Sequence, residues 1–547
     1  MIHLNEHLWD FRQHLHAMIS IPDCIIRLQT ILVAMVLAAL GVLPARAADL
    51  AAEIRAKLED PAPLVVAGQQ LDRAGLWFGY RERGFQPIWT GQPALAKALA
   101  SALADAAADG IDPESLRAGL LAAALADPAR SAAERELLSS DRFLAYARAL
   151  AQGQVDPATI EQDWALPRPS FDAGAVLGRL AQSRDIAGIA SSLRPGGDDY
   201  ARLRTALARY RALAEAGGWK TLDGGKIEPG EKGPRVRALR ARLAAEGDLP
   251  AALAEGDDFD APVKEAVKRF QARHGLDVDG RVGVATLAAL DASAADRVAR
   301  IRVALERWRE MPRDWPATRI VVNAAAATLT FYRNDNPEIV SRVIVGAPIH
   351  PTPVLRARAE FVLFNPPWKV PTSIVRKEIM PKVRRDPNYL AHNHYVELGG
   401  GRLQQEPGPW NALGRIKLEL PNPFDVYLHD TPGRALFARS KRMLSHGCIR
   451  VEAIKPLALA LLGEGWTIAA IDEAIAAGTT RRVDLRETVP VYILYLTAFV
   501  NADGTVQFRD DAYGRDERLM AALSSIETTG TAASIAGEKL ETGCPAG

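Results

Sequence analysis

The sequence predicts a multidomain α+β protein: a helical N-terminal scaffold, a small three-helix module, and a β-rich domain with a capping insertion. The length of 547 residues, at roughly 150 residues per domain, suggests three to four domains. Apolar residues recur at helical spacing through the N-terminal half, and β-branched runs replace that pattern from about residue 318. The composition, 48% apolar and 24% charged, excludes intrinsic disorder as the main state.

The first 47 residues predict an export signal. The run Thr30–Leu43 is apolar and uncharged, and Ala45-Arg46-Ala47 follows it, as in a signal peptide with a small-residue cleavage site. Such a short run does not comfortably span the ~30 Å of a bilayer core. We therefore expect a cleaved signal and a periplasmic protein, with retention as a membrane anchor as the alternative. The polar stretch before the run leaves translation from Met18 open.

Residues 49–220 predict a helical scaffold domain. The segment is rich in Ala, Leu and Arg, and its apolar residues are spaced as in Leu95, Leu99 and Leu103, with Pro or Gly at the breaks. No cluster of His, Cys or paired acids at catalytic spacing occurs in it. We expect this domain to be architectural.

A Gly- and Lys-rich linker is predicted over 220–232, and helical periodicity returns after it. The segment from Phe270-Gln271 through Gly275-Leu276 and Asp279-Gly280 resembles the three-helix peptidoglycan-binding domain, over about 226–290. These residues encode mainly helix packing and a tight turn. Binding of glycan or stem peptides and a purely architectural role both stay open.

A β-rich domain is predicted over 318–480. Its strands are expected in β-branched runs bounded by Asn, Asp, Gly and Pro, and one flanking helix is expected. The strands are 319–323, 328–332, 342–346, 360–364 and 425–428, and the helix is 455–462. The polar segment 372–420 is too long for a plain loop, so a lid or subdomain is expected there. We expect a C-terminal strand and extension over 481–520 and a disordered tail over 521–547.

Charge and cysteine content exclude several classes of function. The net charge is +1, from 67 basic and 66 acidic residues, so no general positive field exists to bind nucleic acid. Cys24, Cys448 and Cys544 are too few and too scattered for a disulfide framework or a cysteine-based zinc cluster. Cleavage of the signal would remove Cys24. A disulfide between the other two is not expected, because Cys544 lies in the predicted disordered tail.

Candidate catalytic residues are concentrated in 426–433 and 444–451. A thiol needs a neighbouring imidazole to ionise at neutral pH, and a glycine before it lets backbone amides approach a developing oxyanion. His429, Gly447 and Cys448 supply these groups. A cysteine packed as a small apolar core residue is the alternative. Zinc binding by His429, His446 and Cys448 is another, although a fourth ligand is missing.

The pattern His-x(15)-Ser-His-Gly-Cys-Ile-Arg, from His429 to Arg450, resembles the L,D-transpeptidase family with the YkuD-type catalytic domain. Further segments resemble its large YcbB-like members, which carry a scaffold, a peptidoglycan-binding module and a capped catalytic domain. These segments are Glu306–Arg309, Val345–Gly346, Pro351–Pro353, Asn365–Pro371 and Asp503–Gly514.

The resemblance implies a role for each candidate residue. Cys448 is the nucleophile, His429 its base, and the amides of Gly447 and Cys448 form the oxyanion hole. Asp430 orients the imidazole through its main chain. The remaining residues are expected to hold the donor or to shape the pocket and lid; they are Ser445, His446, Arg450, Tyr427 and Trp368.

The implied reaction is acyl transfer without a cofactor or metal. The thiolate attacks the bond after the third residue of a tetrapeptide stem, releases D-alanine, and passes the acyl group to an amine of another stem. An L,D-carboxypeptidase or endopeptidase would share the first half-reaction, and a noncatalytic wall-binding scaffold is the other alternative. Peptidoglycan stem peptides and glycan are the expected partners, with transient association with cell-wall synthases and no nucleic acid. The acceptor amine and the oligomeric state stay open.

Overall fold

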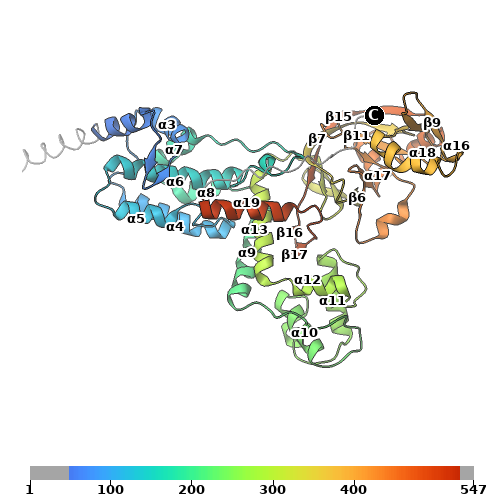
Figure 1. The fold of residues 1–547 in the computed structure, drawn as a ribbon, viewed down its shortest axis with the longest axis horizontal. Helices are drawn as coiled ribbons and strands as arrows, with labels where there is room; N and C mark the ends of the chain where they lie inside the picture. Colours follow the sequence, from blue (N-terminus) through green and yellow to red (C-terminus); the bar gives the residue numbers. More distant parts are fainter. Residues whose placement is uncertain (1–48, 530–547) are drawn as a thin grey trace, which may run out of the picture. The chain divides into compact units, whose positions relative to one another are not determined.

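The structure, a computed structural model, describes residues 49–529 (Figure 1). The expected export signal and residue Cys544 lie outside the described residues. Within the described part, no helix combines the length and apolarity needed to cross a membrane. The chain divides into two units. The first comprises the chain up to Ala100, Gly119–Leu144 and Asp172–Ile189, and the second comprises Ser101–Ala118, Ala145–Phe171 and everything from Ala190 onward.

The N-terminal region is helical, as predicted. A helix over 49–59 is followed by α3 to α8. Their bounds are α3 Arg73–Arg81, α4 Pro93–Asp105, α5 Ala118–Ala126, α6 Ala132–Gln152, α7 Ala173–Ser183 and α8 Ile186–Leu193. The buried carboxylate of Glu136 accepts hydrogen bonds from the Tyr80 hydroxyl (2.9 Å) and the Trp89 and Thr90 amides (3.0 and 2.9 Å). It anchors the loop before α4.

The predicted scaffold region 49–220 is divided between the two units. Residues 145–171 and 190–220 belong to the second unit. Strand β3, Trp164–Ala165, pairs in parallel with β7, Val354–Phe364. The backbone hydrogen bonds of β3 are thus satisfied at an edge of the sheet in the β-rich domain. The sequence carries no local signal for this long-range pairing.

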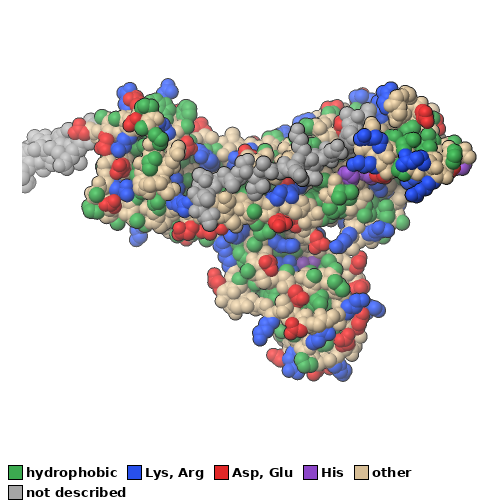
Figure 2. Space-filling view, in the orientation of Figure 1, with side chains coloured by type: hydrophobic (Ala, Val, Ile, Leu, Met, Phe, Trp, Pro, Cys, Tyr) green, Lys and Arg blue, Asp and Glu red, His purple; other side chains and the backbone are tan. Residues whose placement is uncertain are grey.

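The three-helix module is present as α10 Pro234–Glu246, α11 Ala261–Arg273 and α12 Val284–Asp291. The expected linker is partly inside it, because Leu222 and Ile227 are buried in its core and Ile227 exchanges backbone hydrogen bonds with Val282 (3.0 and 3.1 Å). Acidic and basic side chains are intermixed over the face of α10–α12 shown in Figure 2.

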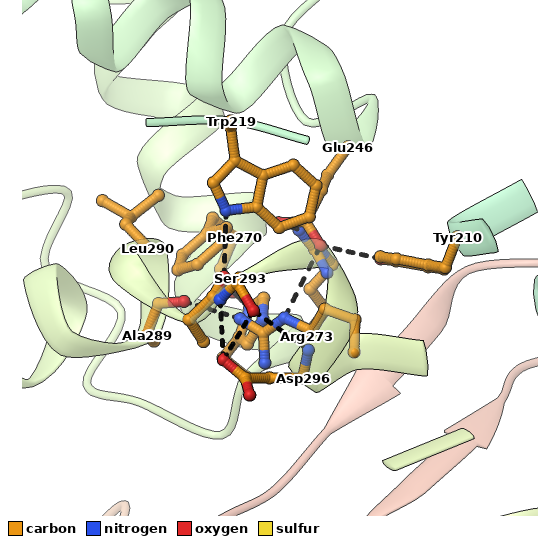
Figure 3. Close-up of polar contacts among 12 residues, drawn as sticks. Tyr210, Trp219, Glu246, Phe270, Arg273, Ala289, Leu290, Ser293 and Asp296 are labelled. Carbon is orange, nitrogen blue, oxygen red and sulfur yellow. Dashed lines mark hydrogen bonds and ion pairs between the residues drawn. The ribbon is translucent and has the colours of Figure 1, made fainter. Parts of the chain in front are cut away.

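One buried carboxylate joins this module to two long helices, α9 Asp198–Glu215 and α13 Ala294–Glu310. Glu246 accepts a hydrogen bond from the Tyr210 hydroxyl of α9 (2.7 Å) and lies 3.0 Å from the Arg273 guanidinium of α11 (Figure 3). Arg242 (2.6 Å) and Arg297 of α13 (3.8 Å) also approach it. The module is therefore docked through charged groups removed from water, as well as through its apolar core.

The β-rich domain is one closed sheet in the strand order β11-β12-β14-β6-β5-β4-β15-β7, with β7 pairing back to β11. The strands not yet given are β4 Arg319–Asn323, β5 Thr328–Arg333, β6 Asn336–Gly346, β11 Ile416–Glu419, β12 Leu428–His429, β14 Ile449–Val451 and β15 Arg481–Leu494. Alternate residues of each strand fill the interior, as in the burial of Ile320 and Val322 beside the less buried Val321. Helices α17 Ile454–Leu462 and α18 Ile468–Ala476 complete the core.

Three predicted boundaries of this domain are wrong. The domain does not end at 480, because β15 pairs with both β4 and β7 inside the sheet. The strand predicted over 425–428 is observed only at Leu428 and continues to His429 instead. Asp425 has a positive φ of 51°, which interrupts an extended backbone. Residues 521–529 are helical rather than disordered, since α19 runs Arg515–Thr529 and buries Leu523 and Ile526.

Most of the predicted insertion 372–420 folds as a small subdomain together with β8, whereas its last residues form β11 of the closed sheet. Strands β8 Trp368–Lys369, β9 Tyr395–Glu397 and β10 Leu403–Gln405 form a three-stranded sheet. Short helices accompany it: α14 Thr372–Ile374, a π-helical turn Val375–Ile379, α15 Met380–Val383 and α16 Tyr389–His392. Five buried residues form a core of its own: Val370, Ile374, Val375, Ile379 and Leu403.

We expect hydrogen exchange to be faster across 372–420 than across β4–β6. The subdomain core is small and separate from the sheet core, so local opening exposes little apolar surface. Exchange followed by mass spectrometry of peptides from both regions measures the difference. Equal protection of the two regions would identify a rigid insert instead of a cap.

Candidate active site

The candidate base ends strand β12, and the candidate nucleophile directly precedes β14, its parallel neighbour. In the β12–β14 pairing, Leu428 is opposite Ile449 and His429 is opposite Arg450. Leu428 and Ile449 are fully buried in the sheet core. Because side chains alternate along a strand and registered partners share a face, His429 and Arg450 lie on the opposite face. The pairing thus places the base on one strand and the cysteine at the start of the next.

The His429 imidazole is held neutral. Burial, followed by the positive charge of Arg450, lowers the pKa of His429 from 6.5 to about 3, and backbone groups of Asp430 and Leu413 oppose this shift. The ring packs edge-on to Tyr427, with centroids 5.5 Å apart. Nδ1 is buried without a hydrogen-bond partner among the described residues. A neutral imidazole can accept the proton of a thiol.

The turn before the nucleophile is held by Ser445. Its hydroxyl donates to the Cys448 carbonyl (2.5 Å) and accepts from the Gly447 amide (3.2 Å). Gly447 has φ +112°, a conformation that favours glycine. In this state the Gly447 N–H donates to Ser445, and its role toward an oxyanion stays a prediction. Ser445 shapes the turn through these two bonds.

The sulfur of Cys448 is nearly inaccessible in this state. The residue is 4% exposed, and Sγ lies 3.8 Å from the Asp425 carbonyl oxygen. Cys448 is in a disulfide whose partner lies outside the described residues, contrary to the expectation of a free thiol. Nucleophilic chemistry requires its reduction, since a thiolate is the attacking species.

Further side chains line the same face. The Arg450 guanidinium is largely buried, its Nε has no hydrogen-bond partner among the described residues, and burial lowers its pKa. Tyr427 is half-buried; burial and the charge of Glu419 raise its pKa, and a hydrogen bond with Trp368 of β8 opposes the rise. The largely buried guanidinium of Arg450 is suited to bind a carbonyl or carboxylate oxygen of a substrate.

The sequence analysis missed two residues of this face. Lys417 is opposite His429 in the β11–β12 pairing, and its Nζ lies 4.0 Å from the Tyr427 ring centroid and 2.8 Å from the Glu419 carboxylate. Ile416 and Leu418 alternate with Lys417 and Glu419 along β11, and both are buried. The alternation in 416–419 is the signal that could have identified the strand.

The other candidate base lies away from this face. The Nε2 atom of His446 is 2.5 Å from the Glu378 carboxylate in the π-helical turn of the subdomain, and the His446 ring is 5.0 Å from that of His350. His446 thus links the nucleophile's turn to the subdomain.

Asp430 supports the strand that carries the base. Its amide donates to the Ile416 carbonyl (2.9 Å), and its carboxylate accepts from the Arg415 amide (3.0 Å) and Arg434 (3.1 Å). Gly414 allows this contact, since a Cβ there would lie 2.5 Å from Asp430. No group of three His, Cys, Asp or Glu side chains within residues 49–529 could hold a metal ion.

Comparisons with known proteins match three parts of the chain. A scaffold domain matches residues 79–207, a "Putative peptidoglycan binding domain" residues 232–290, and an L,D-transpeptidase catalytic domain residues 317–484. A "Putative L,D-transpeptidase" of Haemophilus influenzae is 34% identical over 221 residues, which are 37% of this chain and 45% of that protein. The chain thus spans less than half the length of that relative.

Solved structures are more distant. An L,D-transpeptidase from Stackebrandtia nassauensis is 13% identical, covering 50% of this chain and 96% of its own, with a TM-score of 0.22. The L,D-transpeptidase LdtMt1 in complex with imipenem is 15% identical, covering 32% and 59%, with a TM-score of 0.18. Scores this low do not establish a shared arrangement of the whole chain. By sequence, however, residues 317–484 match the L,D-transpeptidase catalytic domain, and the same chain carries the matches to the scaffold and peptidoglycan-binding domains.

Proposed function

We propose that the protein is a periplasmic L,D-transpeptidase that forms 3-3 cross-links in peptidoglycan. The observation that carries this proposal is the pairing of β12 with β14, which places a neutral buried imidazole at the end of one strand and a cysteine directly before the next. The apolar run and cleavage pattern before residue 48 support export.

The first half-reaction makes a thioester. His429 accepts the proton of the reduced Cys448 thiol, and the thiolate attacks the carbonyl carbon after the third residue of a tetrapeptide stem. The Cys448 amide stabilises the oxyanion, and the protonated imidazole returns its proton to the departing amine of D-alanine. Arg450 holds an oxygen of the donor.

The second half-reaction repeats these steps with a new amine. An amine of another stem attacks the thioester, His429 accepts its proton, and the thiol is regenerated. The subdomain over 372–420 supports transfer over hydrolysis, because a closed cap excludes water from the thioester. The 226–290 module supports retention on the wall.

Incubation of the reduced protein with purified tetrapeptide muropeptides, followed by mass analysis, tests the proposal. D-alanine release together with a cross-linked dimer is the expected result. Release without dimer would identify a carboxypeptidase, and dimer cleavage an endopeptidase. No release at all would leave only a wall-binding role.

The nucleophile is tested by covalent labelling. A carbapenem presents a strained acyl group to a thiolate, so we expect a stoichiometric adduct on the reduced protein and none on Cys448→Ala. Intact-protein mass spectrometry measures the adduct. An adduct that persists in the variant would assign the nucleophile elsewhere.

A further inference from the structure

Two sequence motifs with no role so far meet behind the nucleophile. One is the loop 347–353 between β6 and β7, which contains Thr352, and the other is the C-terminal segment that contains Tyr513. Thr352 is fully buried and Tyr513 is 8% exposed. Thr352 contacts Gly447 in the turn that carries Cys448, and both residues contact Gly346 at the end of β6.

The Thr352 hydroxyl bridges two backbone groups. It accepts a hydrogen bond from the Gly346 amide (2.9 Å) and donates one to the Gly447 carbonyl (2.7 Å). The direction of each bond is certain, because an amide can only donate and a carbonyl can only accept. The hydroxyl therefore restrains the peptide group between Gly447 and Cys448.

Tyr513 holds the loop in place. Its hydroxyl donates to the Gly346 carbonyl (2.7 Å) and accepts from the Thr352 amide (3.4 Å). Its ring stacks on Tyr495, with centroids 5.0 Å apart. At Gly346 the loop passes so close that a Cβ would lie 2.0 Å from the His350 carbonyl oxygen. The position of Thr352 is thus set by contacts from two separate segments.

The restrained peptide group contains the amide assigned to the oxyanion. In a planar trans peptide the carbonyl and the N–H point in opposite directions, so a tether on the Gly447 carbonyl also sets the direction of the Cys448 N–H. Gly447 has φ +112°. Because glycine adopts many backbone conformations, its own torsional preference does not fix the orientation of the Gly447–Cys448 peptide group. The hydrogen bond from Thr352 holds it instead, and Ser445 holds the two neighbouring peptide groups through the Gly447 amide and the Cys448 carbonyl.

We infer that Thr352, supported by Tyr513, is a positioning residue that aims the Cys448 amide at the tetrahedral oxyanion of acyl transfer. This inference rests on the proposed function. Direct loss of an oxyanion-hole donor slows a reaction by ~10²–10³-fold. Misdirecting the donor while keeping it should cost less, roughly 10–100-fold.

Two reactions of the reduced full-length protein distinguish a misdirected Cys448 amide from a general disruption of the site. Carbapenem acylation passes through an oxyanion, whereas alkylation of the same thiol by iodoacetamide does not. We expect Thr352→Val to slow acylation about 10–100-fold and alkylation less than about threefold. Thr352→Ser keeps the hydroxyl and should stay within about threefold of wild type in both reactions. Thr328→Val, on β5 beside buried Leu329, is the matched control and should change neither.

Each outcome decides. Acylation of Thr352→Val at the wild-type rate, or an equal loss of acylation and alkylation, would overturn the inference while leaving the proposed function intact. A wild-type protein that neither acylates nor releases D-alanine would overturn both. If Thr352→Val does not fold, Tyr513→Phe decides in its place. It should slow acylation at least about threefold with unchanged alkylation, and wild-type rates in both reactions would overturn the inference.

Discussion

Replacing His429 with alanine is expected to slow acylation of Cys448 by ~10²–10⁴-fold, the range for loss of a positioned general base. His429 ends β12, and Cys448 directly precedes β14, the parallel neighbour of that strand. Its pKa of about 3 keeps the resting imidazole neutral, so lowering the pH from 8 to 5 does not protonate it in the free enzyme. The base is therefore available across the physiological range.

His446→Ser is the matched comparison, because His446 is only two residues from Cys448. Its imidazole contacts Glu378 of the subdomain, so we expect a loss of about tenfold or less. Single-turnover acylation of the reduced variants by a carbapenem measures both. The reverse order of severity would exchange the roles of the two histidines.

Glu246→Ala is expected to destabilise the docked three-helix module by roughly 3–5 kcal/mol, the cost of breaking a buried ion pair from one side. The Glu246 side chain is fully buried, and its removal would leave Arg242, Arg273 and Arg297 without their shared carboxylate (Figure 3). The Tyr210 hydroxyl would also lose its acceptor. Hydrogen exchange of peptides from α9–α13 measures the loss.

Glu265→Ala is the control, since Glu265 pairs with Lys268 on the exposed side of α11 and should leave stability close to that of the wild type. Burial alone would raise the pKa of Glu246, but Arg273, Arg242 and Arg297 outweigh it and hold the pKa well below 4.5. A depressed carboxyl pKa contributes stability above the unfolded value and loses it as the pH falls. The difference between wild type and Glu246→Ala should thus be constant from pH 8 to 6 and shrink only in acid. Equal effects of the two variants would show that Glu246 contributes no more than a surface pair.

The sequence by itself determined which residues carry the chemistry and which elements surround them. The β-branched runs 319–323 and 328–332 predicted strands that the structure contains as β4 and β5. The Ser-His-Gly-Cys motif predicted the nucleophile, and its glycine has the positive φ that favours this residue. Helical spacing likewise predicted α10 and α11, whose apolar faces pack together.

Tertiary structure alone decided how these parts meet. The pairing of β15 with β4 and β7, and of β3 with β7, joins residues far apart in the chain, and no local pattern encodes such a register. The subdomain over 372–420 was expected as a lid or subdomain, but its core residues are recognisable only once β8–β10 are paired. The same holds for Thr352 and Tyr513: their hydroxyl groups acquire a role only where the folded chain places them beside Gly346 and Gly447, because a hydrogen bond depends on distance and direction rather than on residue type.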